Sequence, residues 1–125
     1  MADDFGQLIA LLDGETTDIA ENAKVELISV GGQVVEPLAA AIGMLEPYGQ
    51  LSAIEIFEHF GDRAAGPALI GLLASDNSTV REWSARALGD LGVHEAVPAL
   101  QAAYRRHGSA VTDRTGPRRP RFVRR

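Results

Sequence analysis

The chain has 125 residues and a formal net charge of −5, and 46% of its residues are apolar. This length suits one domain with its own core. No apolar run approaches the roughly 20 residues that cross a bilayer, and the acidic start lacks the basic region of a secretory signal. Because the chain has no cysteine, disulfides, thiolate metal sites and cysteine nucleophiles are excluded. We therefore expect a cytoplasmic protein without a membrane partner.

The net charge hides an asymmetry between two parts of the chain. Residues 1–104 contain sixteen acidic and four basic residues, a balance of −12. Residues 105–125 contain eight arginines and Asp113, a balance of +7. The acidic part would repel phosphates and attract basic partners. A run of like charge seldom packs into a core, so the sequence predicts a domain over 1–107 and a disordered Arg-rich tail over 108–125.

Seven helices are predicted in chain order. They cover residues 3–13, 17–30, 34–44, 48–60, 64–74, 79–91 and 94–107. Apolar residues three and four positions apart share one helix face. In the sixth helix these are Val80, Ala87, Leu88 and Leu91, with the small residue Ser84 among them. Capping boxes predict helix starts at Ser52–Glu55 and Thr79–Glu82, and Pro47 offers an earlier start for the fourth helix. The acids Asp18 and Glu21 suit the start of the second helix.

Three glycines precede prolines by six residues and divide these helices into pairs. The pairs are Gly31 and Pro37, Gly61 and Pro67, and Gly92 and Pro98, spaced by 30 and 31 residues. Such a period indicates a stack of repeats. Each Gly is expected to end a helix in the left-handed conformation, and each Pro to lie in the first turn of the next. The sequence therefore predicts an all-α fold, a short right-handed α-solenoid of about three helix pairs.

A leading helix precedes the three pairs. Its segment Leu8–Leu12 resembles Leu69–Leu73, which lies 61 residues, or two periods, further along. The first helix is therefore predicted to be the second helix of an incomplete unit. A stack that ends without a polar capping helix can expose apolar surface and promote dimerisation.

The third unit resembles the HEAT-like repeat of the phycobilisome-lyase type. The resemblance is carried by residues 75–81, 87–92 and 96–100 and extends over about 5–105. It implies that Asp76 and Arg81 support packing between repeats. The first two units depart from this pattern, so the resemblance does not imply a continuous Asp–Arg ladder. Members of the family include bilin lyase subunits, chaperones and adaptors, and the fold alone does not choose among them.

Candidate functional residues are few. His59 lies one turn after Glu55, which suits a metal or acid–base pair, although a solvated pair at this spacing is the favoured interpretation. His94 with Glu95 in a turn, and His107 at a helix end, are interpreted in the same way. The sequence contains no phosphate-binding loop, zinc-protease motif or serine-nucleophile motif. No catalytic residue, metal or cofactor is therefore predicted.

Partner-binding residues are predicted near the C-terminal end of the domain. Trp83 is the single tryptophan and is either a binding hot spot or a packing residue. Tyr104, Arg105 and Arg106 either form an aromatic and basic surface or place favourable cations at a helix end.

The predicted function is a non-enzymatic interaction module: a scaffold, an adaptor or an immunity-type binder in which a small acidic domain masks a basic toxin. Its binding surface is expected on the second helix of each pair, residues 34–44, 64–74 and 94–107, and its partner is a protein, which the acidic body predicts to be basic. Two alternatives stay open. The arginines of the tail suit salt-dependent nucleic-acid binding, and the family resemblance suggests a bilin lyase-like or chaperone subunit.

Overall fold

The computed structural model describes residues 2–107, with side chains from Phe5 onward, and all seven predicted helices are present. The first helices of the pairs are α2 (Thr17–Val30), α4 (Pro47–Phe60) and α6 (Ser78–Leu91). The leading helix and the second helices are α1 (Ala2–Ala10), α3 (Val35–Ala41), α5 (Gly66–Leu72) and α7 (Val97–His107). The 3-10 turns are η1 (Leu11–Asp13), η2 (Gly32–Val34), η3 (Ile42–Met44), η4 (Arg63–Ala65) and η5 (His94–Ala96). The described part of the chain contains no strand.

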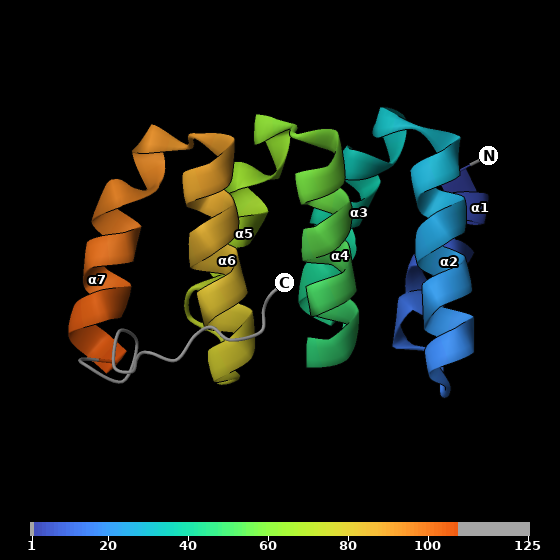
Figure 1. The fold of residues 1–125 in the computed structure, drawn as a ribbon, viewed down its shortest axis with the longest axis horizontal. Helices are drawn as coiled ribbons and strands as arrows, with labels where there is room; N and C mark the ends of the chain where they lie inside the picture. The colour runs from blue at the N-terminus through green and yellow to red at the C-terminus, as the bar shows by residue number, and fades with distance from the viewer. Residues whose placement is uncertain (1, 108–125) are drawn as a thin grey trace.

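The helices form two layers (Figure 1). Helices α2, α4 and α6 stand side by side in front, and α1, α3 and α5 lie behind them. Each of these rear helices packs against the front helix that follows it in the chain: α1 on α2, α3 on α4, and α5 on α6. Helix α7 stands at the end of the row, beyond α6. The prediction of a short all-α solenoid is confirmed.

The hydrophobic core runs continuously between the two layers. Its largest fully buried side chains include Phe57, Leu27, Leu38, Leu69 and Leu88. Burying one such side chain stabilises the fold by about 1.5–3 kcal/mol. The core therefore links all three helix pairs along the stack.

The glycine turns agree with the prediction in two of three units. Gly61 and Gly92 have φ of 63° and 69° and adopt the left-handed conformation. The prediction is wrong for Gly31, whose φ of 114° and ψ of 179° belong to an extended region that glycine alone adopts readily. The reason is that one residue separates α2 from η2, whereas two residues separate the helix from the 3-10 turn in the later units.

Two predicted helix starts are also corrected. Ser52 is buried in the middle of α4, which begins at Pro47. Thr79 is the second residue of α6, and the cap is Asn77, whose side chain accepts a hydrogen bond of 3.0 Å from the N–H of Val80. Because Asn77 caps the free N–H of Val80, α6 begins one residue before Thr79 and does not need the capping box.

The start of α4 is held by the turn that follows the leading helix. The Asp13 carboxylate accepts the N–H of Glu46 at 3.0 and 3.2 Å. Gly49 lies against this carboxylate, and a Cβ there would overlap it. This polar contact therefore joins two units and requires glycine at position 49.

Within the described residues, no single helix is long and apolar enough to cross a membrane. One pair, Thr17–Val30 with Gly32–Met44, passes the test of length and composition together but is bent by 115°. The predicted disordered tail over 108–125 lies outside the described residues.

Candidate interaction surface

The second helices present one surface of small, mostly uncharged residues, which we call the second-helix face. Its positions recur every 31 residues, and all are exposed except Ala102, which is half-buried. They are Glu36, Ala40, Gly43, Pro67, Gly71, Ala74, Pro98, Ala102 and Arg105. The face therefore carries only two charged side chains.

Two glycines on the second-helix face have no packing role in the described structure. A Cβ added to Gly43 or Gly71 would meet no heavy atom within 4 Å among the described residues. Neither glycine has a positive φ. Because glycine in a helix costs up to about 1 kcal/mol relative to alanine, the fold would be more stable with alanine at these two positions. The second-helix face thus has smaller side chains at these two positions than the folding of the described residues requires.

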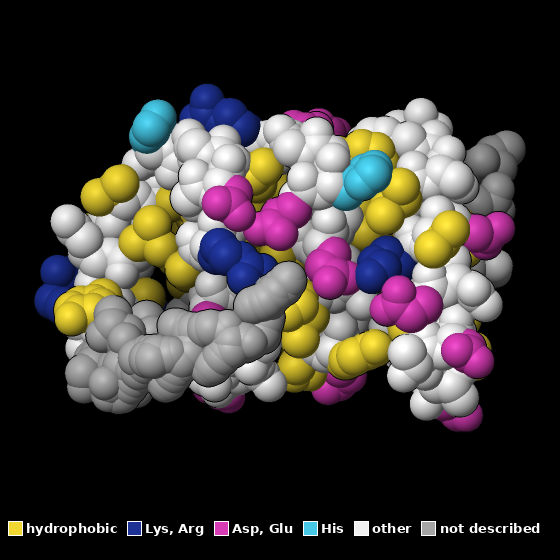
Figure 2. Space-filling view, in the orientation of Figure 1, with side chains coloured by type: hydrophobic (Ala, Val, Ile, Leu, Met, Phe, Trp, Pro, Cys, Tyr) yellow, Lys and Arg dark blue, Asp and Glu magenta, His cyan; other side chains and the backbone are white. Residues whose placement is uncertain are grey.

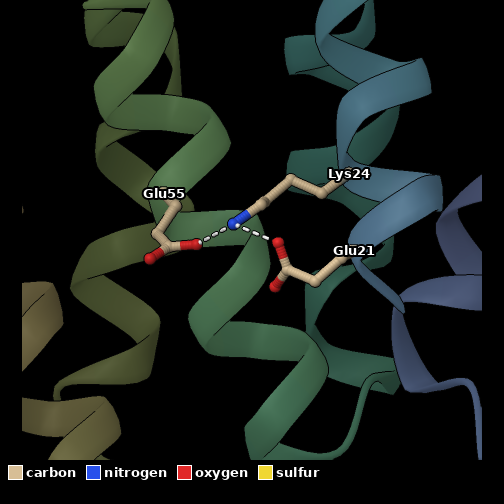
Figure 3. A network of polar contacts seen from close by, with 3 residues as sticks. All are labelled: Glu21, Lys24 and Glu55. Carbon is tan, nitrogen blue, oxygen red and sulfur yellow. Dashed lines mark hydrogen bonds and ion pairs between the residues drawn. The ribbon is translucent and has the colours of Figure 1, made fainter. Parts of the chain in front are cut away.

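The opposite layer is charged. Figure 2 shows acidic and basic side chains gathered across the face that α2, α4 and α6 form. Lys24 of α2 lies between Glu21 and Glu55, at 3.1 and 2.6 Å from their carboxylates (Figure 3). Burial acts to lower the pKa of Lys24, but the hydrogen bonds with both carboxylates outweigh it and raise this pKa above its ordinary value. This network joins α2 to α4.

Glu58 lies near the middle of the charged layer. Burial raises the pKa of its carboxyl group, the charge of Arg86 counteracts this in part, and the charges of Asp90 and Glu55 add to the rise. Its Oε2 atom is enclosed and accepts no hydrogen bond from the described residues. Burial beside other carboxyl groups favours the neutral form of a carboxyl group, which can share its proton with Asp90. We therefore interpret Glu58 as a local weakness in the packing of α4.

The candidate histidine pairs are used in other ways. Glu55 binds Lys24, while the His59 ring packs edge-on against Phe60, with the ring centroids 4.9 Å apart. Glu95 pairs with Arg63 at 3.4 Å and joins η5 to η4. The described residues contain no cluster of three or more potential metal ligands.

The four predicted partner-binding residues divide between two helices. Trp83 is half-buried on α6 and packs against the core, with the Arg86 guanidinium 5.5 Å from its ring centroid. Tyr104, Arg105 and Arg106 are exposed on α7. Within the described structure, no aromatic or cation–π contact joins Trp83 to this second group. A binding role for these residues stays a prediction.

Asp76 and Arg81 lie at the entry to α6. Arg81 donates a hydrogen bond of 2.8 Å from Nη1 to the carbonyl of Ser75, which fixes the loop before the helix, and Asp76 is exposed. The described contacts between units instead come from other residues, such as Asp13, Lys24 and Arg63. The implied role of Asp76 and Arg81 in packing between repeats stays a prediction.

Sequence reasoning did not single out Gly43 and Gly71. The available signal was their position inside predicted helices and away from the repeat turns, where glycine is unfavourable. Their exposure could not be inferred without knowing which helix faces pack together.

Comparison with known proteins gives one match. A family model described as HEAT repeats matches residues 35–114, more than half of the chain. No curated protein and no solved structure matches the chain significantly.

Proposed function

Because the chain belongs to the HEAT-repeat family, we propose that it is a non-enzymatic scaffold or adaptor whose second-helix face receives a partner protein. HEAT repeats commonly serve as protein-interaction modules. The observation that carries the choice of face is its row of small, mostly uncharged positions, which includes Gly43 and Gly71. A Cβ at either glycine would meet no heavy atom of the described residues within 4 Å; the same holds for Gly89 on the opposite layer, so the whole row and not the glycines alone carries the choice.

Small residues favour close contact with a partner. Without long side chains, the backbone of a partner helix can approach α3 and α5 closely, and few charged groups need to lose their water. Small surface residues also lose little conformational entropy on binding. The opposite layer would have to release side chains from networks such as Glu21–Lys24–Glu55. The second-helix face is therefore the better docking surface.

The chemistry of the partner follows from the charge of the domain. Residues 1–104 have a balance of −12, which attracts a partner with basic groups around its contact surface and raises its rate of association. Glu36 is the acidic residue of the second-helix face itself. We therefore propose a basic protein partner.

Affinity capture with a substituted face tests this function. Gly71→Arg adds a long side chain to the second-helix face and should abolish capture of a protein that the unsubstituted chain retains. Val25→Arg, at an exposed position of the opposite layer, is the matched control and should leave capture unchanged. Circular dichroism should show folded protein in both cases. Equal capture by the two variants would contradict the proposed face.

The phycobilisome-lyase subtype stays a prediction, as do a bilin lyase-like or chaperone role, nucleic-acid binding by the tail, and a cytoplasmic location. Mixing the protein with a bilin and recording visible absorbance tests the enzymatic alternative. No observation on the described residues favours it over a scaffold.

A further inference from the structure

The last helix of the described chain carries an apolar ridge that is not covered. Val97 and Tyr104 are 48% and 49% exposed, and Leu100 between them is partly buried. Their spacing of three, four and seven residues places them on one side of α7. We call these three residues the end ridge.

The corresponding residues of the two earlier units form the core. In α3 and the turn after it they are Val35, Leu38 and Ile42, which are 1%, 0% and 4% exposed. In α5 and the residue after it they are Gly66, Leu69 and Leu73, all buried. Helices α3 and α5 are covered by the first helix of the next unit. Helix α7 is the last described helix, so its end ridge keeps core-type residues without that cover.

The shape of this end suits a second copy of the chain. Helix α7 corresponds to α3 and α5, and it extends beyond α6, which leaves a step where a further first helix would stand (Figure 1). A copy related by a two-fold axis parallel to the helices would place its own α7 in that step and receive the first α7 in the same way. Ala85 and Gly89 of α6 are small; Ala85 is half-buried and Gly89 is exposed. They leave room for the end ridge of the second copy.

The charges at this end also suit self-association. Helices α6 and α7 run in opposite directions, so the first turns of α6 and the last turn of α7 lie at the same edge of the stack. The two-fold axis brings these edges together and places Arg105 of each copy near Glu82 of the other. Both side chains are exposed in the single chain. An Arg–Glu pair repeated by symmetry favours this arrangement over other contacts between two acidic molecules.

The tail is a poorer occupant for the end ridge. Residues 108–125 contain six arginines and one acid, and their larger apolar residues are Val111, Phe122 and Val123. Helix α7 already ends in Arg105 and Arg106. The tail would bring six more arginines to them, whereas a second copy brings two arginines together with Glu82. From these observations we propose that the chain forms a symmetric dimer through the end ridge. This interface shares only Arg105 with the second-helix face, and the substitutions that test the two surfaces are different, so each can fail without the other.

Sedimentation equilibrium of the full chain tests the dimer. The unsubstituted chain should show a monomer–dimer equilibrium, and Tyr104→Asp should raise its dissociation constant by at least about thirtyfold. Tyr48→Asp is the matched control because Tyr48 is also 49% exposed but lies at the start of α4. It should leave the equilibrium unchanged. A chain that stays monomeric at all concentrations, or an equal effect of both variants, would overturn the proposal.

Cysteine cross-linking tests the geometry independently. The natural chain has no cysteine, so Glu82→Cys and Arg105→Cys each introduce a single thiol. Under oxidation, an equal mixture of the two variants should form disulfide-linked dimers faster than either variant alone. If the mixture cross-links no faster than the separate proteins, the proposed pairing of Glu82 with Arg105 is wrong. A monomer whose end ridge instead binds the tail or another protein would also overturn it.

Discussion

Glycine has opposite effects at two positions of this chain. Gly71 is exposed, has no positive φ and has open space around it, whereas Gly61 ends α4 with φ of 63°. We expect Gly71→Ala to raise the free energy of unfolding by about 0.5–1 kcal/mol and Gly61→Ala to lower it by about 1 kcal/mol. Urea denaturation measures both. A loss of stability in Gly71→Ala would show that the fold itself requires glycine at this position of the second-helix face.

Glu58 gives a prediction about pH. Its folded-state pKa is raised, chiefly by burial, so the unfolded state releases this proton at a lower pH than the folded state does. Ionisation of Glu58 therefore opposes folding above the ordinary pKa of a glutamate, and the loss grows through the folded-state value. We expect Glu58→Gln to raise the melting temperature at pH 7 and to have little effect near pH 3.

Glu55→Gln gives a comparison within the same layer, and it also removes a charge that adds to the raised pKa of Glu58. It weakens the contact with Lys24, whose raised pKa means that this contact stabilises the fold at neutral pH and up to the ordinary pKa of lysine. The melting temperature should therefore fall slightly at pH 7, because the free energy of unfolding falls by less than about 1 kcal/mol. A melting temperature at pH 7 that fell in Glu58→Gln would contradict the burial argument for Glu58.

At the scale of helices, the sequence predicts most of what is observed. The repeated glycines and apolar spacings place all seven helices, because the turn at Gly61 or Gly92 and the stripe before it are local features. The sequence predicts the start of α6 too late, because Asn77 and Thr79 are both good caps. Which of them caps the helix depends on the path of the backbone before it. Gly31 was misassigned because a turn one residue shorter leaves no mark in the Gly–Pro spacing.

The cap of α6 can be tested directly. Asn77→Ala removes the acceptor for the N–H of Val80 and should lower the free energy of unfolding by about 1 kcal/mol. Thr79→Ala, two residues later on the exposed side of the helix, should change it by less than about 0.5 kcal/mol. Thermal unfolding followed by circular dichroism separates the two. If Thr79→Ala lowered the free energy of unfolding more than Asn77→Ala, the capping box at Thr79–Glu82 would be the start of α6.

For the whole molecule, the repeat in the sequence predicts which helices form the second-helix face. It does not predict which side chains of those helices are exposed. The stripes that bury Leu38 and Leu69 look the same in sequence as the stripe that leaves Val97 and Tyr104 exposed. The difference arises because a following helix covers the first two and none in the described chain covers the third. The exposure of a helix therefore depends on its place in the stack, which no single segment of sequence records.

The charge of the molecule predicts how a partner associates. An acidic domain attracts a basic partner over distances that salt shortens. The rate constant for association should fall as ionic strength rises, while the rate constant for dissociation changes little. Stopped-flow fluorescence can follow binding through Trp83, the single tryptophan. Association that is independent of salt would argue against a basic partner.

Photo-cross-linking from defined positions tests most directly whether the second-helix face binds a protein. A photoreactive residue would replace Ala40 or Ala74 on the second-helix face, and Val25 on the opposite layer as the control; all three are exposed. We predict that illumination in the source cells links a common protein partner to positions 40 and 74 and not to position 25. Cross-links from position 25 alone would contradict the proposed function and place the binding surface on the charged layer.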